Sequence, residues 1–393
     1  MGYWSHWILS AALVSALAGC ASPGSTNQAL LPSSWPDARY GYDPSLIRED
    51  ATTLLELDAP LIAQLHSDAV QNLSTERRTQ YLLAQLLGPQ STPFTYRYGQ
   101  STPARQTWYD RQGDCLSLTV LALAMAQHLR LNAIVQEVSV PANYNRRQGV
   151  DFRSGHVNLF IDRGTVTDAA APIGFSPGLV VDFEPVEGTI RRGRPLKLDA
   201  LLARYYNNAG AQALADANWS LAYTYLKQAV LHDNQFGPAL TNLAWLYHQN
   251  GDLAAAEEAL QLALQRDEGH ETANHALYQL LKSQGRDAEA RVLRATLDAN
   301  RKNDPYYWIN RGQEYLQQGS TDRAVAALER AQELTTGFAE VHRYLAQAYL
   351  LLGKTAKAQK KKKQNAHIEQ QDPTLPTLKS KLLSKKLKKK KKK

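Results

Sequence analysis

The second half of the chain repeats with a period of 34 residues, and this period constrains the fold more than any other feature. Glycines recur with this spacing at Gly251, Gly285, Gly319 and Gly353. Alanines recur with the same spacing at Ala222, Ala256, Ala290, Ala324 and Ala358. A fixed period of this length indicates stacked units, each burying one face against the next unit.

Glycine suits a turn between two helices, and a small alanine suits a place where two helices cross closely. The pattern resembles the tetratricopeptide repeat, with units at about 203–236, 237–270, 271–304, 305–338 and 339–372. The first unit has Ala217-Asn218-Trp219 at its turn, and the last passes into Lys360–Lys363. We therefore predict an all-α solenoid of four to five units over 203–366. The resemblance implies a protein partner on its concave face.

The N-terminus resembles the signal of a bacterial lipoprotein. Residues 7–18 form a 12-residue apolar run, which is too short to cross a bilayer and typical of a secretory signal. The run ends in Leu17-Ala18-Gly19-Cys20, which is similar to a lipobox. The resemblance implies a signal peptide over 1–19 and a lipid on Cys20, which would anchor the chain in the membrane. Ala21 favours the outer membrane, with the protein facing the periplasm. An ordinary buried helix is the alternative.

Two further segments are predicted to lack a fold of their own. Residues 20–45 are rich in Ser, Pro, Gly and Asn, which indicates a flexible tether. From Lys354 to the end there are 16 Lys against Glu369 and Asp372, so this segment has a net charge of +14. The whole chain has a net charge of +8, so the rest of the chain has a net charge of −6 (8 minus 14). We expect a disordered Lys-rich tail over 367–393. It is either a solvated end or attracted to anionic lipid headgroups. The expected secretory signal argues against nucleic acid as a partner of this tail.

Residues 46–200 are predicted to form an α+β domain. Helical patterns cover 46–88 and 116–131, and the second is apolar nearly all round, as in a central buried helix. Strand-like runs follow at 133–140, 156–162, 164–168 and 179–183. A hairpin turn is expected at Asp162-Arg163-Gly164. Helices followed by antiparallel strands are typical of α+β folds.

Cys115 stands at the start of the apolar helix and is the candidate nucleophile. A helix N-terminus favours a thiolate over a thiol, and its N–H groups can hold an oxyanion. Gly113 allows a tight entry to the helix. Asp114 is expected to face solvent or to cap the helix. A lipidated Cys20 would leave Cys115 without a disulfide partner, and an unpaired thiol outside the cytoplasm is expected to be either used or buried. A buried structural cysteine is therefore the alternative.

A base and a group to orient it are the next requirement of such a site. His156 opens a strand, in contrast to the other histidines, which lie in helices, in the repeats, in the tail or in the signal. Asp182 lies in an apolar strand that ends at Pro185, where a buried carboxylate needs a partner. Asp168 is the alternative third member, because it also ends an expected strand.

These three segments together resemble the transglutaminase-like superfamily, whose fold is similar to that of papain-like cysteine peptidases. The segments are Arg111–Thr119 around Cys115, Gly155–Asn158 around His156 and Val181–Pro185 around Asp182. The insertion of Ala169–Gly178 lengthens the spacing and leaves the third position open between Asp182 and Asp168. The resemblance implies that Cys115 attacks a peptide amide or an ester, that His156 moves the proton and that Asp182 holds the imidazole.

Two functions remain open from the sequence. One is an envelope-anchored thiol hydrolase or acyltransferase that acts on peptide bonds, with the repeats recruiting a protein substrate or partner. The other is a non-enzymatic scaffold or assembly lipoprotein with a silent transglutaminase-like domain. The intact set of Cys115, His156 and Asp182 favours the first. No cofactor and no metal is expected, since the chain has no carboxylate-rich calcium loop.

Overall fold

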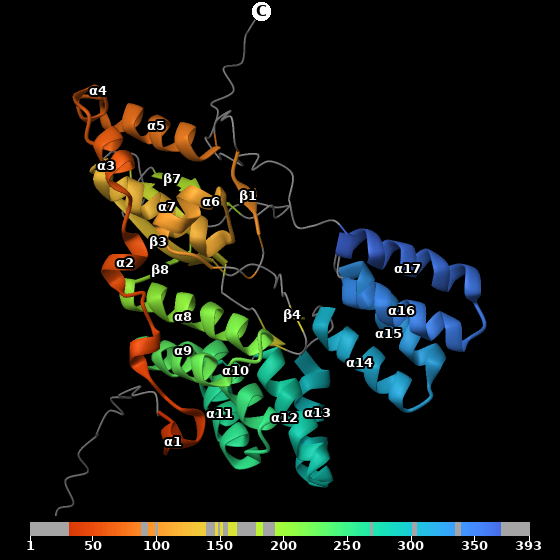
Figure 1. Cartoon of the computed structure of the whole chain (residues 1–393). Coiled ribbons are helices and arrows are strands. Elements are labelled where there is room, and N and C mark those ends of the chain that lie inside the picture. Colours follow the sequence, from red (N-terminus) through yellow and green to blue (C-terminus); the bar gives the residue numbers. More distant parts are fainter. Residues whose placement is uncertain are drawn as a thin grey trace, which may run out of the picture.

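The computed structural model describes residues 31–87, 93–97, 99, 101–138, 146–147, 150–151, 156–162, 178–183, 193–267, 270–300, 305–334 and 339–370. Cys20, Asp168, the strand expected over 164–168 with its turn, and the tail beyond residue 370 lie outside these ranges. Within the ranges, the helices are too short or too polar to span a bilayer. The described chain forms an α+β unit followed by an array of paired helices (Figure 1).

A four-stranded antiparallel sheet forms the centre of the α+β unit. Its strands lie in the order β7 (Gly178–Val181), β6 (His156–Asp162), β3 (Ala133–Val138) and β8 (Arg194–Pro195). The register places His156 opposite Val138 and Ile161 opposite Leu179. The edges of β6 over 159–161 are therefore both occupied, by β3 and by β7.

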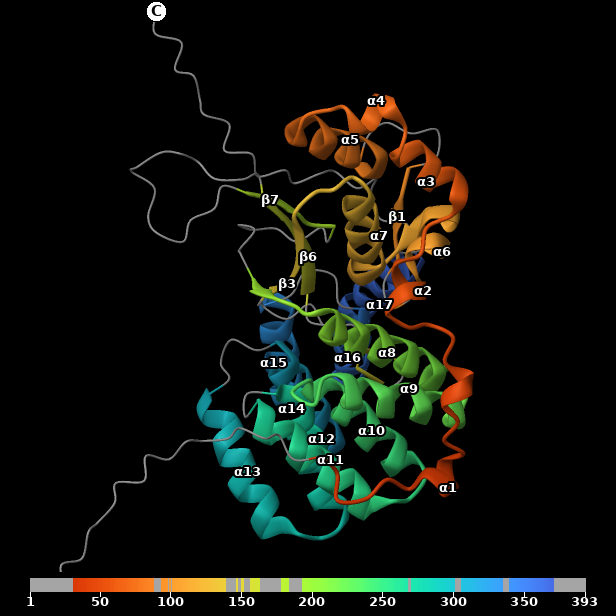
Figure 2. The same cartoon turned by 90° about the vertical axis from the view of Figure 1, so that its left-hand side faces the viewer.

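The apolar helix α7 (Cys115–His128) packs on β3 and β6, as the central helix that the sequence predicts. Several helices cover its other sides: α2 (Ala51–Leu55), α3 (Ala59–Leu65), α5 (Thr75–Leu87) and α6 (Ala104–Asp110). Figure 2 shows the sheet on one side of α7 and α3 and α6 on the other. Residues buried on α7 run from Cys115 to Ala126 without interruption, because neighbours surround it.

The helical pattern expected over 46–88 is divided into several short helices. The aspartates Asp50 and Asp58 cap α2 and α3, and Pro60 follows at the start of α3. A turn also separates α3 from α4 (Asp68–Gln71) and α5. Short strand pairs complete the unit: β1 (Thr95–Tyr96) beside β2 (Gln112–Gly113), and β4 (Arg146–Arg147) beside β5 (Val150–Asp151).

Five helix pairs form the array. They are α8 (Leu198–Ala215) with α9 (Trp219–His232), α10 (Gly237–Gln249) with α11 (Leu253–Arg266), α12 (Glu271–Ser283) with α13 (Asp287–Asn300), α14 (Pro305–Gln317) with α15 (Thr321–Leu334), and α16 (Ala339–Leu351) with α17 (Thr355–Gln370). The array thus begins at Leu198, before the expected residue 203. The basic run Lys360–Lys363 is part of α17 instead of ending the repeats.

The periodic glycines and alanines have separate physical roles. All four glycines follow the first helix of a pair with positive φ angles of 69° to 73°, and a Cβ at any of them would meet open space. The backbone conformation, not a lack of room, therefore requires glycine there. The alanines are at most 1% exposed, as expected for small residues where two helices pack closely. Ala217 stands where the first unit lacks glycine and adopts a positive φ of 56°.

Residues 33–49, here called the strap, are docked on the repeats, which corrects the part of the expected tether over 20–45 that the structure describes; residues 20–30 lie outside the described ranges. The strap includes α1 (Asp37–Tyr40) and a 3-10 turn at Pro44–Leu46 and lies along the repeat helices, as Figure 1 shows. The ring of Tyr40 is buried and stacks on Tyr223 of α9, with ring centroids 5.1 Å apart. Asp37 accepts two hydrogen bonds of 2.7 Å from Lys227.

One apolar core joins the α+β unit to the first three helix pairs. It extends from Tyr40 through α7 and the sheet to Ala290 of α13. A second, smaller core lies within the last two pairs, from Ile309 to Ala358. The α+β unit and the start of the array are therefore one body, whereas the last two pairs have a core of their own.

Candidate functional site

A buried aspartate holds the start of α7, directly before Cys115. The Asp114 carboxylate accepts hydrogen bonds from the Ser117 backbone N–H at 2.8 Å, the Ser117 hydroxyl at 2.8 Å and the Ser101 hydroxyl at 2.6 Å. It thus caps the helix, which is one of the two orientations expected for it. Burial raises the pKa of Asp114 above its usual range, and the hydrogen bonds from Ser101 and Ser117 oppose this rise.

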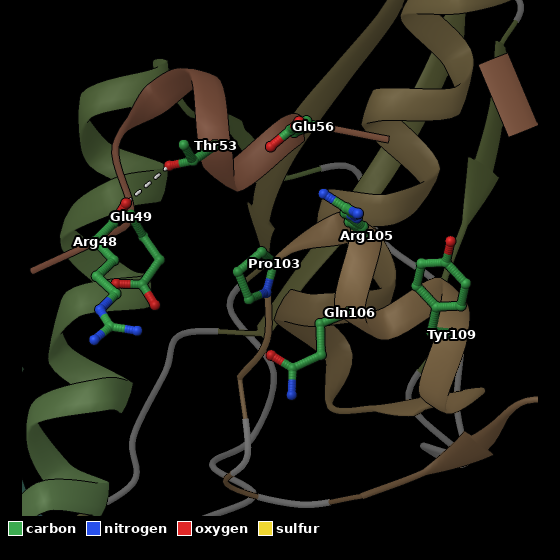
Figure 3. A pocket seen from close by; sticks show the side chains of 8 residues that line it. All are labelled: Arg48, Glu49, Thr53, Glu56, Pro103, Arg105, Gln106 and Tyr109. Atoms are coloured by element: carbon green, nitrogen blue, oxygen red, sulfur yellow. Dashed lines mark hydrogen bonds between the residues drawn. The ribbon is translucent and has the colours of Figure 1, made fainter. Parts of the chain in front are cut away.

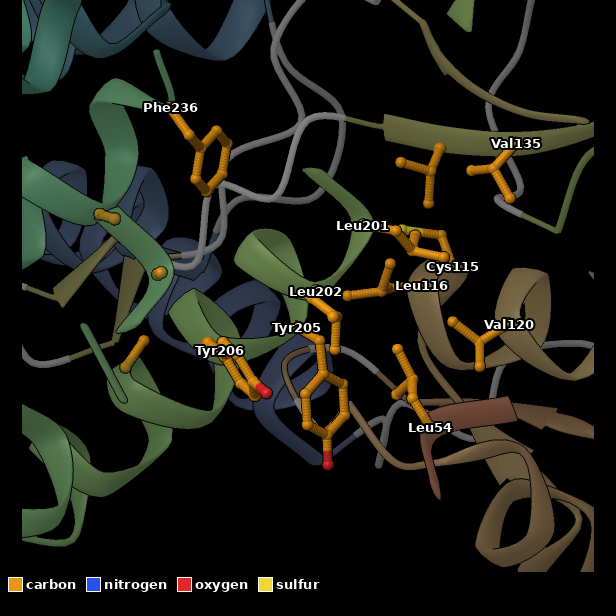
Figure 4. Packing of buried hydrophobic residues seen from close by; sticks show 14 of the residues in the cluster. Leu54, Cys115, Leu116, Val120, Val135, Leu201, Leu202, Tyr205, Tyr206 and Phe236 are labelled. Atoms are coloured by element: carbon orange, nitrogen blue, oxygen red, sulfur yellow. The ribbon is translucent and has the colours of Figure 1, made fainter. Parts of the chain in front are cut away.

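The entry to α7 is tight, as the sequence predicts for Gly113. A Cβ on Gly113 would lie 2.6 Å from the Cβ of Ser117, so no larger residue fits without displacement. Cys115 follows as the first residue of the helix and is 5% exposed. Figure 4 places it with Leu116 of α7 and Leu201 and Leu202 of α8 in one buried cluster. The first repeat helix therefore belongs to the surroundings of the thiol.

His156 and Asp182 lie together, on the neighbouring strands β6 and just after β7. The His156 Nε2 and the Asp182 Oδ2 are 2.8 Å apart, with 3% and 10% of the two side chains exposed. This pair has the geometry of an orienting carboxylate on an imidazole. Because α7 packs on β6, the helix that carries Cys115 and the strand that carries His156 are adjacent.

Asn158 is a further member of this group that the sequence reasoning missed. Its Nδ2 donates to the same Asp182 oxygen at 3.4 Å, and its side chain is fully buried. The signal for it is the period of a strand, since residues two apart share one face. Val157, Leu159 and Ile161 alternate with His156 and Asn158 and belong to the apolar core.

A surface depression elsewhere contains none of the predicted site residues. Figure 3 shows its lining at the end of the strap, α2 and α6: Arg48, Glu49, Thr53, Glu56, Pro103, Arg105, Gln106 and Tyr109. Its charges are mixed and mostly exposed, so it lacks a built binding site. Among the residues that the structure describes, no three His, Cys, Asp or Glu side chains gather as a metal site requires.

The repeat array offers a second candidate surface. The first helices of neighbouring pairs contact each other: α8 contacts α10, and α14 contacts both α12 and α16. In the described parts of the chain, the second helices of neighbouring pairs contact each other less. Spacing is shortest on the inner side of a curved stack, so the first helices line the concave side. β5 contacts α8 and α10. The short strands β4 and β5 therefore lie on the concave side of the first two helix pairs.

Comparison with known proteins identifies the repeats. A family model described as tetratricopeptide repeat matches residues 237–270 and 305–336. Together with the five helix pairs, this establishes a helical solenoid of tetratricopeptide repeats over the second half of the chain. The repeats support a protein-binding role. A search of the curated proteins gave no match.

Several solved structures resemble part of the chain. MamA is 20% identical, with 43% of this chain and 92% of that chain covered and a TM-score of 0.29. A Pseudomonas aeruginosa pilF structure is 21% identical over 44% of this chain and 78% of that chain, with a TM-score of 0.34. YrrB, described as a TPR protein with an unusual peptide-binding site, is 16% identical over 44% and 89%, with a TM-score of 0.27.

Proposed function

We propose that this protein is an envelope-anchored scaffold whose repeat array binds a partner protein on its concave side. The observation that carries the proposal is the tetratricopeptide array itself, with five helix pairs and two segments that match the repeat family. Repeats of this kind stack into extended concave surfaces that suit a polypeptide ligand. Because β5 lies on α8 and α10, the partner would use α12, α14 and α16.

Photo-crosslinking in cells tests the scaffold. A photoreactive amino acid would replace Gln279 of α12 or Gln347 of α16, which are exposed on first helices. Val292 of α13, exposed on a second helix, is the matched control. A specific adduct of one mass from the first helices, with none from Val292, is expected. Equal labelling at all three positions would contradict a concave binding surface.

The lipid anchor belongs to the same proposal. It is supported by the Leu17–Cys20 sequence and by the apolar run before it. The strap is docked from residue 33, so the segment between Cys20 and Ser33 would link the lipid to the folded body. Cys20→Ser should release the protein from membranes or leave it unprocessed, and palmitate incorporation would then be lost. Unchanged incorporation would refute the anchor.

A second candidate function, thiol-dependent acyl transfer on peptide bonds, is favoured by one specific observation. His156 pairs with Asp182 and lies on β6, which packs against the helix that begins with Cys115. In this mechanism the Cys115 thiol would lose its proton to His156 and its sulfur would attack the carbonyl carbon. N–H groups at the start of α7 would stabilise the oxyanion. His156 would then protonate the leaving amine, and water would release the acyl group.

Alkylation of Cys115 tests this second function. The rate of reaction with iodoacetamide would be measured from pH 5 to pH 9, with peptide mass spectrometry to separate Cys115 from Cys20. His156→Ala should slow the reaction near neutral pH, because it removes an imidazolium that stabilises the thiolate. Asp182→Asn should have a smaller effect and Asp168→Asn almost none. Equal profiles for the wild type and His156→Ala would leave the scaffold as the only function.

A further inference from the structure

Buried amides form a hydrogen-bonded line across the first two repeats. The Asn242 Nδ2, on α10, donates to the Asn207 Oδ1 at 2.9 Å. The Asn207 Nδ2 donates to the Asn208 Oδ1 at 3.3 Å, and the Asn208 Nδ2 donates to the Ser101 Oγ at 2.8 Å. The three asparagines are at most 3% exposed. Buried amides are costly unless their hydrogen bonds are made, so this line is a built feature.

The line continues from Ser101 to the first turn of α7. The Ser101 hydroxyl donates to the Asp114 Oδ2 at 2.6 Å, and the Asp114 Oδ1 accepts from the Ser117 N–H at 2.8 Å. The Ser117 hydroxyl in turn accepts from the Thr102 N–H at 2.9 Å. A repeat helix is thereby connected to the helix start that carries Cys115, through the carboxylate that caps it.

The hydrogen bonds in the line all run the same way: each side chain accepts from the one before it and donates to the next. Because the Asn208 Oδ1 accepts from Asn207, its amide cannot rotate without losing that bond. The Asn208 Nδ2 therefore faces the Ser101 oxygen, which leaves the Ser101 hydroxyl hydrogen for Asp114. Asn208 thus sets which way the donor beside Asp114 points.

Asn242 occupies the same repeat position as Asn208 and belongs to the line, whereas the asparagine at this position of the fourth helix pair does not. Asn310 of α14 lies three repeat lengths after Asn208 and is 2% exposed. Its amide nitrogen and oxygen have no hydrogen-bond partner in the part of the chain that the structure describes. A buried asparagine at this repeat position therefore does not by itself require such a line.

We propose that Asn208 is a positioning residue for Cys115, acting through Ser101 on Asp114 and so on the first turn of α7. The inference rests on the second proposed function, in which the Cys115 thiol is the nucleophile. The first repeat helix would then be part of the thiol site, and not only a support for a partner.

Other ionisable groups also face this region. Tyr205 of α8 lies near Asp114, and burial, with the Glu49 carboxylate, raises the pKa of its hydroxyl. Glu49 accepts hydrogen bonds from Tyr205 at 3.2 Å and from Tyr225 at 2.8 Å. His156 lies on β6, against which α7 packs. The substitutions below leave all four groups in place, so a change in the thiol is attributable to the line.

The test measures the pKa of the Cys115 thiol in the full-length protein, from the pH dependence of iodoacetamide alkylation at that residue. Ser101→Ala should raise it, because Asp114 loses a hydrogen-bond donor and holds the first turn of α7 less firmly. Asn208→Ala should raise it too, because the Ser101 hydroxyl is then no longer directed toward Asp114. We expect alkylation at pH 7 to slow about fivefold. The double variant should shift no further than Ser101→Ala alone, since both changes act through one path.

Asn310→Ala is the matched control, and it should leave the alkylation profile of Cys115 unchanged. Thermal unfolding of each variant reports the loss of stability. The proposal is overturned by an unchanged profile for Asn208→Ala, by additive shifts in the double variant, or by a lowered pKa, which would mean that the Asp114 charge outweighs the cap. Failure of the second function appears separately, as an unchanged profile for His156→Ala.

Discussion

The guanidinium of Arg204, on the first repeat helix, binds the carboxylate of Glu137 on β3 of the sheet. The Arg204 Nε and Nη2 donate to the Glu137 Oε1 at 3.0 and 2.5 Å. Its Nη1 donates to the Asp233 Oδ2 at 3.0 Å. Arg204 is 2% exposed, so one buried cation joins the sheet, α8 and the end of α9.

Arg204→Met should therefore destabilise the whole body. The substitution removes the buried cation from Asp233 and leaves Glu137 with the exposed Arg194 alone, and breaking a buried pair of this kind typically costs about 3–5 kcal/mol of unfolding free energy. Arg194→Ala is the matched control, since Arg194 binds the same Glu137 at 2.8 Å but is 69% exposed. The control should cost about 0–1 kcal/mol. Urea unfolding measures both, and equal effects would contradict the role of Arg204.

Glu137 should also make stability depend on pH. Burial acts to raise the pKa of Glu137, but the Arg204 charge and the hydrogen bonds from Arg194 and Arg204 outweigh it, so the folded pKa lies below the ordinary 4.5. A depressed carboxylate pKa stabilises the fold above the ordinary value, and this stability is lost as the pH falls through the folded pKa. The unfolding free energy should drop below about pH 4.5 in the wild type and drop less in Glu137→Gln. Parallel curves would contradict this.

The turn of the first repeat offers a stabilising substitution. Ala217 holds a positive φ of 56°, where the other four units have glycine. Ala217→Gly should raise the unfolding free energy, by up to about 1 kcal/mol, because glycine adopts this conformation without strain. Gly251→Ala at the equivalent turn should have the opposite sign. Thermal unfolding of both variants checks the pair, and the same sign for both would show that φ is not the cause.

The sequence predicted the features that depend on local chemistry. The spacing of Gly251 and the later glycines predicted the helix pairs, because each pair needs the same turn. The apolar run after Cys115 predicted a central buried helix, because no polar stripe was left for solvent. The sequence proposed Asp182 as the group that orients His156, with Asp168 as the alternative, and the proximity of His156 and Asp182 depends on how β6 and β7 pair.

Features that depend on distant partners could not be predicted. The expected boundary near residue 203 would have cut α8 and separated Arg204 from its environment. An arginine is buried only where carboxylates meet it, and Glu137 is 67 residues away. The strap had the composition of a tether, yet Trp35, Tyr40 and Tyr42 indicated docking. Flexible segments contain few aromatic residues, because such rings favour burial.

The strap prediction can be tested at Tyr40. Its ring stacks on Tyr223 at 5.1 Å and lies 5.4 Å from the ring of Tyr247, so it spans two repeats. Tyr40→Ala should cost about 3–5 kcal/mol of unfolding free energy, as for other large aromatic residues in a core. The loosened strap should also be cleaved faster by a protease.

Arg39→Ala is the control for this prediction, because Arg39 is in the same short helix but is 50% exposed, with one ion pair to Asp252 at 3.1 Å. It should cost about 0–1 kcal/mol. Urea unfolding and limited proteolysis of both variants would be compared with the wild type. If Tyr40→Ala loses no more stability than Arg39→Ala and its strap is cleaved no faster, residues 33–49 act as a tether after all. A large loss confined to Tyr40→Ala means that the strap fastens the chain to the first two repeats, and that only the segment before residue 33 can give reach to a lipid anchor.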